Sequence, residues 1–422
     1  MALVKFSRKE FERHCKITKE IEEKISLLGT PLERLTEEEV EIEIFPNRHD
    51  LLSLQGYIRS FKAFIGKEKD NKKYIVKKPE KDYRVIVANS VKSVRPYTVC
   101  AIVKDLVLDD EKIKEIIDIQ EKLHSTVGRN RKKLAIGIYP LEKISLPIRF
   151  EAKKPEEIKF IPLEYDKELN GMQILQRHPT GREYAHLLEG NEKFPVFIDA
   201  KNNILSMPPI INSQETGKIT EKTKEVFVEC SGFDLNALKK TLNILVTTLA
   251  DMGGKIYQME IKYEETIITP NLDYETIKIS LENTNNLFGL KLTEKDLEKL
   301  LPKMGYEYTA GKVKIPAWRM DILHEVDIIE DIAIAYGYDK FIPEIPKVAT
   351  IGEESKESKI EEKIAEILIG LGLIEISSYQ LIKVEEAKEL KIEEKIEVEN
   401  SKTEYKFLRP NLKISALRIL SE

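Results

Sequence analysis

Four acidic residues occur within a short stretch near residue 320. Asp327, Glu330 and Asp331 have the spacing i, i+3 and i+4, and Asp321 comes shortly before them. A helix would place three of these carboxylates on one face, where like charges repel by a few tenths of a kcal/mol. Such a face needs either solvent or a cation, and carboxylate oxygens suit a hard cation such as Mg²⁺. The spacing therefore leaves two alternatives, a magnesium site or a solvated acidic surface.

The residues around these acids predict the elements that carry them. Lys312 to Ile315 has the pattern of a short strand, and a turn with Trp318 and Arg319 follows it. The next segment is helical to about Tyr336, where Gly337 ends the helix. Two shorter helices and a two-stranded hairpin come before it, which is a winged-helix-like order.

A second group of polar residues lies in the middle of the chain, within apolar segments predicted to be strands. The group consists of Ser206, Asn212, Glu229 and Ser231. Hairpins that bring these side chains together would form a pocket that binds a polar ligand through hydrogen bonds. The alternative is a set of buried polar residues that satisfies the ends of strands.

A run of cations separates a predicted helix, Asp109 to His124, from a predicted strand, Leu134 to Ile138. A basic loop in this position could bind phosphate, although most such runs are solvated. The four cations are Arg129, Arg131, Lys132 and Lys133.

Composition limits the class of protein. The 422 residues suffice for three or four domains, and 41% hydrophobic with 33% charged residues indicates real cores under an ion-rich surface. The net charge of −5 argues against a generic nucleic-acid binder but allows a local basic patch. Three dispersed cysteines argue against disulfides and zinc. No segment has the length and apolarity of a membrane span or the core of a signal peptide, so we expect a cytoplasmic protein without a membrane partner.

The segment from Asp321 to Asp339 resembles the signature of the beta subunits of archaeal and eukaryotic phenylalanyl-tRNA synthetase. Other segments resemble further blocks of the same family, in the same order: Glu43 to Gly56, Gln120 to His124 with Gly128 to Arg131, and Ser206 to Asn212. The resemblance implies that Mg²⁺ binds the carboxylates of Asp321, Asp327, Glu330 and Asp331. It also implies an editing pocket for mischarged tyrosyl-tRNA at Ser206, Asn212, Glu229 and Ser231.

In the family that the chain resembles, the alpha subunit binds ATP and phenylalanine and forms the ester, in a complex of two alpha and two beta chains. No nucleotide-binding glycine-rich loop occurs here, which agrees with that division. The expected function is therefore that of a beta subunit of phenylalanine–tRNA ligase, which contacts the tRNA for phenylalanine and edits. The sequence assigns no catalytic residue: a water held by Asn212, main-chain groups and the terminal hydroxyl of the tRNA is as plausible as any side chain.

Four positions depart from the family pattern, and one of them is His49, which stands where Pro is usual. Glu229 and Ser231 stand where Asp and Thr are usual, and Phe197 falls near a usual Leu. The extra methylene of Glu229 would reshape the pocket. Two alternatives therefore remain, a tRNA-binding or assembly protein that does not edit and a freestanding aminoacyl-tRNA hydrolase.

The expected fold class is α+β with several domains. Residues 1–82 would form a small N-terminal α+β domain, 83–265 a mixed-sheet domain for tRNA binding and editing, and 266–342 the winged-helix-like magnesium module. Residues 350–422 resemble the start of a non-catalytic class II synthetase-like antiparallel sheet domain, which in the family continues for about another domain's length. We expect Ser355 to Leu371 to be a helix whose inward face carries Ile360, Ile364, Ile367 and Leu368.

Overall fold

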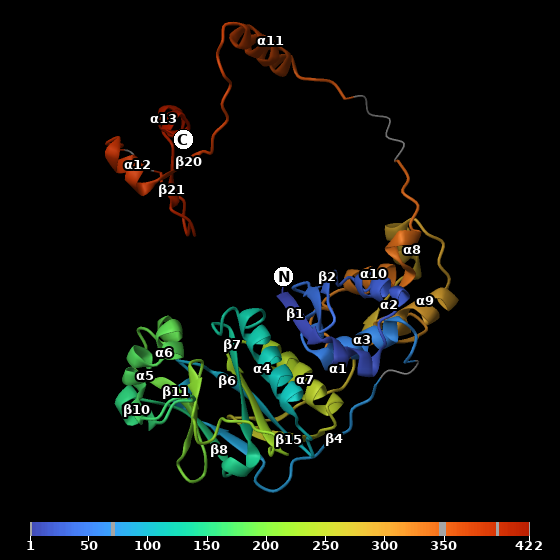
Figure 1. Ribbon diagram of the computed structural model, residues 1–422, viewed down its shortest axis with the longest axis vertical. Helices are drawn as coiled ribbons and strands as arrows, with labels where there is room; N and C mark the ends of the chain where they lie inside the picture. Colours follow the sequence, from blue (N-terminus) through green and yellow to red (C-terminus); the bar gives the residue numbers. More distant parts are fainter. Residues whose placement is uncertain (1, 69–71, 346–351, 394–395, 422) are drawn as a thin grey trace. The chain divides into compact units, whose positions relative to one another are not determined.

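The computed structural model describes residues 2–68, 72–345, 352–393 and 396–421 (Figure 1). It divides into two compact units, with the boundary between Ile342 and Pro343. The first unit contains one large mixed sheet and small antiparallel sheets, so the expected α+β multidomain fold class is confirmed. No helix in the described ranges has both the length and the apolarity that crossing a membrane requires.

The N-terminal part folds as a three-stranded antiparallel sheet, order β1-β3-β2, with helices beside it. Its helices begin where hydroxyl side chains cap them: Ser7 accepts a hydrogen bond from the backbone of Glu10, and Thr18 from that of Ile21. The elements are β1 (Ala2–Ser7), α1 (Arg8–His14), α2 (Lys19–Leu27), β2 (Leu32–Leu35), β3 (Glu39–Ile44) and α3 (Leu54–Phe64).

The large sheet has the strand order β13-β12-β11-β8-β5-β15-β6-β14-β7, and β4 and β16 also pair with β15. Although β7 and β13 stand at opposite ends of this order, the hydroxyl of Tyr139 on β7 lies 3.3 Å from Oδ1 of Asn212 on β13. The sheet therefore curls until its two ends meet. The strands are β4 (Val76–Lys77), β5 (Arg84–Val87), β6 (Tyr97–Lys104), β7 (Leu134–Pro140), β8 (Ile148–Lys153), β11 (Phe194–Ile198), β12 (Ile204–Met207), β13 (Ile211–Asn212), β14 (Val226–Gly232), β15 (Lys255–Lys262) and β16 (Thr266–Thr269).

Alternation along β14 separates a helix face from an inner face. Val226, Val228 and Cys230 belong to the core formed with α4 (Asp110–Ser125) and α7 (Leu235–Asp251). Phe227 belongs to a different core, on the inner side of the curled sheet. Glu229 has the same parity as Phe227 and therefore also points inward.

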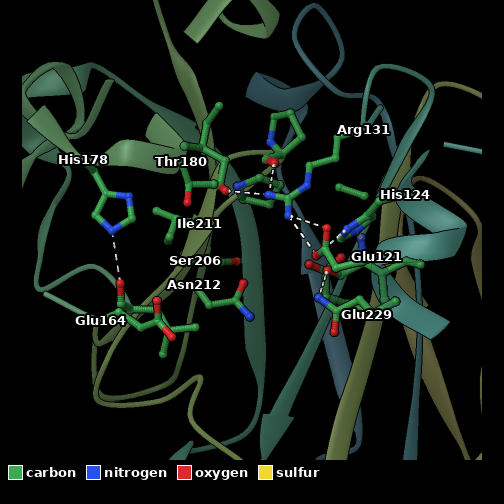
Figure 2. Close-up of a pocket in the computed structure, with 17 residues that line it drawn as sticks. Glu121, His124, Arg131, Glu164, His178, Thr180, Ser206, Ile211, Asn212 and Glu229 are labelled. Atoms are coloured by element: carbon green, nitrogen blue, oxygen red, sulfur yellow. Dashed lines mark hydrogen bonds and ion pairs between the residues drawn. The ribbon is translucent and has the colours of Figure 1, made fainter. Parts of the chain in front are cut away.

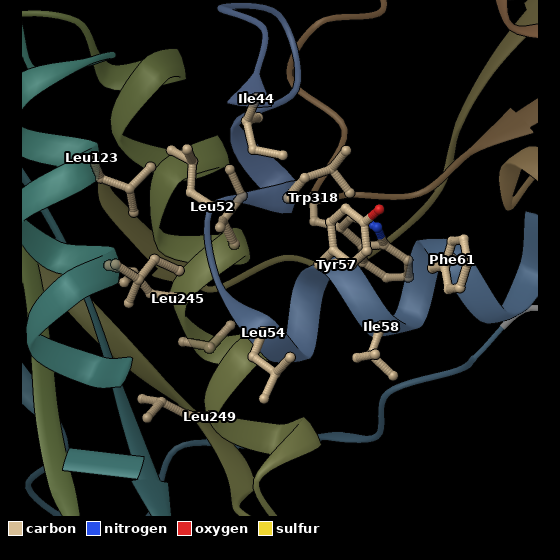
Figure 3. Close-up of a cluster of buried hydrophobic side chains, with 14 of the residues drawn as sticks. Ile44, Leu52, Leu54, Tyr57, Ile58, Phe61, Leu123, Leu245, Leu249 and Trp318 are labelled. Atoms are coloured by element: carbon tan, nitrogen blue, oxygen red, sulfur yellow. The ribbon is translucent and has the colours of Figure 1, made fainter. Parts of the chain in front are cut away.

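The helix-side core continues into the N-terminal domain and the module that follows the sheet (Figure 3). Figure 3 shows Leu123 of α4 and Leu245 of α7 facing the side of the N-terminal domain, and Tyr57 of α3 and Trp318 belong to the same cluster. Asn243 of α7 adds a polar link, since its Nδ2 donates to the carbonyl oxygen of Ala317 at 3.1 Å. The N-terminal domain, the helix side of the large sheet and the module that carries α10 thus share one continuous core.

The module that carries the acidic helix has three strands rather than the expected two, in the order β17-β19-β18. The extra strand, β17, pairs antiparallel with β19 along its whole length. The elements are β17 (Glu275–Lys278), α8 (Leu281–Phe288), α9 (Glu294–Leu300), β18 (Glu307–Thr309), β19 (Lys312–Ile315) and α10 (Glu325–Tyr336).

The second unit contains a small core around Ile382, Ala387 and Ile414. The expected inward face of its first helix is wrong for this chain. Its apolar residues Ile360, Ile364, Ile367 and Leu368 are 42–63% exposed. They pack against no buried cluster of the described residues, because helical periodicity predicts an apolar stripe but not the surface that covers it. The elements are α11 (Lys356–Gly370), β20 (Leu381–Lys383), α12 (Val384–Glu389), β21 (Tyr405–Leu408) and α13 (Lys413–Ser421).

Candidate functional site

A cavity of about 200 Å³ lies where the two ends of the large sheet meet (Figure 2). Ser206 from β12, Asn212 from β13 and Glu229 from β14 all line it, so three of the four predicted pocket residues come together. The end of α4 and the segment around α6 (Pro179–Tyr184) complete the wall. The site is thus built from segments far apart in the sequence.

Glu229 is 2% exposed, and burial raises the pKa of its carboxyl to about 8. It therefore carries its proton at neutral pH and can donate a hydrogen bond. Gly137 stands directly opposite it on β7. A Cβ atom at position 137 would lie 2.7 Å from Oε1 of Glu229 and 2.2 Å from the hydroxyl oxygen of Tyr139. The longer acid therefore fits because the facing residue has no side chain.

Tyr139 contacts all three of these polar residues, and the sequence did not predict it as part of the site. Its hydroxyl lies 2.8 Å from Oγ of Ser206, and 3.3 Å from both Oδ1 of Asn212 and Oε1 of Glu229. Burial raises the pKa of this phenol well above its usual value, so the hydroxyl is neutral. The available signal was the alternation of β7, which places Gly137 and Tyr139 on the same face.

Ser231, the fourth predicted residue, does not line the cavity. Its Oγ accepts a hydrogen bond from Nε of Arg95 at 3.0 Å, and its carbonyl oxygen accepts from Nη2 at 2.6 Å. Burial lowers the pKa of Arg95 to about 10. Ser231 therefore anchors a buried arginine beside the cavity.

Arg131, expected among the tRNA-binding cations, lies in the cavity wall. Its Nη2 forms an ion pair with Glu121 at 2.9 Å, and its Nη1 donates to the carbonyl oxygen of Ile210 at 2.9 Å. The guanidinium also lies over the ring of Tyr184, 4.4 Å from its centre. Although burial opposes ionisation of Glu121, hydrogen bonds and charges from His124 and Arg131 hold its pKa at about 2. Figure 2 shows Arg131, Glu121 and His124 in the wall of the cavity.

Two histidines line the cavity, and they differ in how many of their ring nitrogens have a hydrogen-bond partner among the described residues. Nε2 of His124 accepts from the backbone N–H of Ile136 at 2.8 Å, and its Nδ1 lies 3.2 Å from Glu121. His178 donates from Nε2 to the carbonyl oxygen of Leu163 at 3.1 Å. This bond fixes the tautomer, so Nδ1 is an acceptor, and it is buried with no hydrogen-bond partner among the described residues.

The other predicted cations lie on the turn that joins α4 to β7. Arg129 and Lys132 are exposed, and Lys133 is half-buried with its Nζ 3.3 Å from Asp234. Arg129 and Arg131 both have positive φ, at 49° and 64°. The tight turn separates the roles of these residues, since Arg131 points into the wall while its neighbours reach solvent.

Two of the four predicted magnesium-binding acids pair with an arginine in the module that carries α10. Nε and Nη2 of Arg319 lie 2.8 and 2.7 Å from the two carboxylate oxygens of Asp321, and Nη2 also lies 2.7 Å from Asp331. The hydroxyl of Tyr306 donates to Asp331 as well. Burial opposes the charge of Arg319, but the two carboxylates raise its pKa well above its usual value. The guanidinium thus supplies the positive charge that these acids require.

The remaining two acids have different surroundings. Asp327 accepts hydrogen bonds at 2.8 Å from the backbone N–H groups of Leu323 and His324, which caps the start of α10. Glu330 is exposed. Within the described ranges no group of three or more acidic, histidine or cysteine side chains is arranged to hold a metal ion. All four predicted acids nevertheless line one cavity, in which Arg319 pairs with Asp321 and Asp331, so the expected magnesium set stays a prediction.

Comparison with known proteins places this geometry in a family. Residues 85–247 match the B3/4 domain, 277–338 the tRNA synthetase B5 domain, and 342–422 the phenylalanyl tRNA synthetase beta chain CLM domain. The crystal structure of an N-terminal fragment of the phenylalanyl-tRNA synthetase beta subunit from Pyrococcus horikoshii is similar, with a TM-score of 0.75 at 38% identity. That match covers 79% of this chain and 99% of the fragment. The chain belongs to the phenylalanyl-tRNA synthetase beta-subunit family.

Beta-subunit sequences from archaea agree with this assignment. The phenylalanine–tRNA ligase beta subunit of Archaeoglobus fulgidus is 39% identical over 85% of this chain, and that of Pyrococcus horikoshii is 41% identical over 80%. The matched segments span 65% and 61% of the lengths of these two beta subunits. The family resemblance expected from the sequence is confirmed.

Proposed function

We propose that this chain acts as a beta subunit of phenylalanine–tRNA ligase and that the cavity at the closure of the large sheet is its editing pocket. The observation that carries the proposal is the convergence of Ser206, Asn212 and Glu229, from three strands, on one cavity. Its partners would be the alpha subunit, in a complex of two alpha and two beta chains, and the tRNA for phenylalanine in the cytoplasm. ATP and phenylalanine would bind the alpha subunit.

A separate editing pocket is needed because the two competing amino acids are very similar. Phenylalanine and tyrosine differ by one hydroxyl, and an apolar synthetic pocket rejects an added hydroxyl by only about a hundredfold. A second pocket that contains polar groups can remove the mischarged ester. Hydrolysis at that pocket adds water to the acyl carbon and breaks its bond to the ribose oxygen, which takes a proton as the amino acid leaves.

His178 is our candidate for the group that positions the attacking water. Its Nδ1 is an acceptor without a partner among the described residues, and the side chain lines the cavity. A water that donates to this nitrogen would be oriented, and its proton could pass to the imidazole as the acyl carbon is attacked. His124 is less suited to this role because both of its nitrogens already have partners.

We assign the exposed cations Arg129 and Lys132, with Lys133 beside them, to phosphates of the tRNA. We expect Mg²⁺ to bind the complex together with ATP, because Mg²⁺ is commonly held partly by substrate phosphates. The four predicted acids line one cavity, where an ion would have to compete with Arg319 for Asp321 and Asp331.

Single-turnover deacylation of tyrosyl-tRNA specific for phenylalanine tests the proposal, with the chain alone and with its alpha subunit. Hydrolysis only in the complex supports an editing beta subunit, and hydrolysis by the chain alone indicates a freestanding hydrolase. His178→Gln should slow the reaction by about a hundredfold. Lack of hydrolysis by a complex that still charges tRNA would leave a beta subunit without editing.

A further inference from the structure

A second cleft, of about 660 Å³, lies between the N-terminal domain and the turn that joins α4 to β7. Its charged lining consists of Lys122 from α4 and of Arg129 and Lys133 from the turn. His49 also lines the cleft, but burial lowers the pKa of its imidazole, so it is neutral at pH 7. No acidic side chain is among the described residues of the lining, although the whole chain has a net charge of −5. The cleft therefore attracts anions.

The three cations of the cleft differ in how far other residues already engage them. The guanidinium of Arg129 forms no hydrogen bond or ion pair with the described residues. Nζ of Lys122 donates to the carbonyl oxygen of Leu3 at 2.8 Å, which leaves two of its three N–H groups. Nζ of Lys133 lies 3.3 Å from Asp234, and this lysine side chain is 36% exposed. An anion in the cleft can therefore accept hydrogen bonds from at least Arg129 and Lys122.

The C-terminal end of α4 also borders the cleft, and free carbonyl groups at a helix end would repel an anion. The turn after α4 removes most of this repulsion. The backbone N–H of Gly128 donates to the carbonyl oxygen of Leu123 at 2.8 Å, and that of Arg131 to the carbonyl oxygen of His124 at 3.0 Å. The last carbonyl groups of the helix are thus paired, so the charge of the three cations dominates.

The cleft also presents apolar surface beside its cations. Phe45 is 39% exposed and lines the cleft together with Ile44, Leu52 and Val127. An exposed aromatic ring beside a basic groove is typical of surfaces that bind single-stranded nucleic acid, because the ring stacks on a base while the cations contact the phosphates. An unpaired nucleotide has both of the parts that this lining matches.

We propose that the cleft binds an unpaired nucleotide near the 3′ end of the tRNA, with its base on Phe45 and its phosphate on the three cations. The inference rests on the proposed function, which supplies the tRNA. Arg129 and Arg131 are two positions apart on one turn but line different cavities, the cleft and the editing cavity. An RNA strand whose terminal ester enters the editing cavity can therefore reach the cleft by crossing this turn. The N-terminal domain thereby takes part in tRNA binding.

Phe45→Leu tests the contact with the base, because it removes the ring and keeps an apolar side chain. Filter binding of the tRNA for phenylalanine to the complex with the alpha subunit should weaken by about fivefold or more, the effect of losing one stacked base. The dependence of the affinity on salt should not change, because no charge is lost. A tRNA that lacks its unpaired 3′ nucleotides should bind the variant and the natural complex equally. Phe45→Tyr keeps the ring and should bind the intact tRNA as the natural chain does.

Arg129→Met tests the contact with the phosphate. It should weaken binding of the intact tRNA and reduce the slope of log affinity against log salt concentration by about 0.7, the value for one phosphate of a single strand. With the tRNA that lacks its unpaired 3′ nucleotides, the slope should be the same for the variant and the natural complex.

Tyr97→Leu is the matched control for the loss of the ring. Tyr97 is 37% exposed, close to the 39% of Phe45, but it lines a separate cavity. This variant should keep the natural affinity and the natural salt slope. Melting temperatures, measured alongside, show which variants remain folded.

A folded Phe45→Leu variant with unchanged affinity for the intact tRNA would overturn the inference. So would a loss of equal size in Tyr97→Leu, or a loss that persists with the tRNA that lacks its unpaired 3′ nucleotides. The proposed function survives each of these results, because the natural complex still binds the tRNA. If the natural complex did not bind the tRNA at all, the proposed function would fail together with the inference.

Discussion

Nη2 of Arg319 lies 2.7 Å from Oδ2 of Asp331, and the two side chains are 2% and 6% exposed. The same nitrogen lies 2.7 Å from Asp321. A buried arginine between two carboxylates satisfies their charge as a bound cation would, with bonds fixed by the planar guanidinium. Two of the four acids of the family signature, Asp321 and Asp331, therefore form an internal ion cluster with Arg319 in this chain.

Magnesium should not stabilise the isolated chain through this cluster. The melting temperature, followed by calorimetry while Mg²⁺ is added, is expected to stay constant, because a ligand raises it only when it binds the native state. Asp321→Asn in the same titration is the control for any weak surface effect. A rise with Mg²⁺ that this variant abolishes would show that the carboxylates exchange Arg319 for the ion.

Arg319→Met should lower the free energy of unfolding by about 3–5 kcal/mol, because it leaves two buried carboxylates without a partner. Chemical denaturation measures this change. Arg84→Met is the control: Arg84 pairs with Asp82 at 2.9 Å, but both side chains are 45% exposed. An exposed pair contributes at most about 1 kcal/mol. If both substitutions lowered the free energy of unfolding equally, the buried cluster would not stabilise the fold more than an exposed ion pair does.

Asp327 and Glu330 should behave differently from each other. Asp327→Ala removes the acceptor for two backbone N–H groups at the start of α10 and should cost about 1 kcal/mol of stability. Glu330→Ala should change stability by no more than about 0.5 kcal/mol, since the residue is exposed. Denaturation of the two variants in the absence of divalent ions checks both values. Losses of equal size would indicate that the acids act as one unit.

Local signals predicted most of the elements because they act within a few residues. Ser7 and Thr18 have the hydroxyl side chains typical of a helix start and cap α1 and α2, and Glu39–Ile44, which alternates acidic and apolar residues, forms β3. The acidic helix ends at Tyr336 before Gly337. The additional strand β17 was missed because its four residues acquire strand structure by pairing with β19, and that contact is not local.

The site was predicted in part, for the same reason. Ser206, Asn212 and Glu229 stood out as polar residues in apolar strands, and the cavity brings them together. Tyr139 lies one residue beyond the predicted strand Leu134 to Ile138 and was not singled out, because its contacts depend on closure of the sheet between β7 and β13. Arg319 was likewise overlooked, since spacing along a helix identifies the acids but not the cation that folds between them.

Stability should fall as pH rises through the range in which Glu229 keeps its proton only in the folded state. Burial raises its pKa from 4.5 to about 8, so the native protein binds one more proton than the unfolded chain between these values. This contribution to the free energy of unfolding is complete below pH 4.5, decreases toward pH 8 and then levels off.

Glu229→Gln should remove that dependence, because the amide is neutral throughout. The difference in unfolding free energy between variant and natural chain should shift in favour of the variant from pH 5 to pH 8, by an amount on the order of a few kcal/mol. Glu142→Gln, at an exposed position, is the control. A difference that does not vary with pH would mean that Glu229 is ionised in the folded protein.

Arg131 and Lys132 are adjacent in sequence but should affect different steps. Arg131→Met breaks the bonds to Glu121 and to the carbonyl oxygen of Ile210, so the cavity wall loses its anchor. Deacylation by the complex should slow by about tenfold or more, since charge-assisted hydrogen bonds contribute about 1.5–3 kcal/mol. The affinity for tRNA should change little.

Lys132→Ala should do the opposite, because Lys132 is exposed on the turn. Loss of one phosphate contact weakens tRNA binding and reduces the slope of log affinity against log salt concentration by about 0.7–0.9. Filter binding over a range of salt concentrations, with single-turnover deacylation at saturating protein, separates the two effects. A reduced salt slope in Arg131→Met would place Arg131 on a phosphate, and an unchanged slope in Lys132→Ala would remove Lys132 from the tRNA surface.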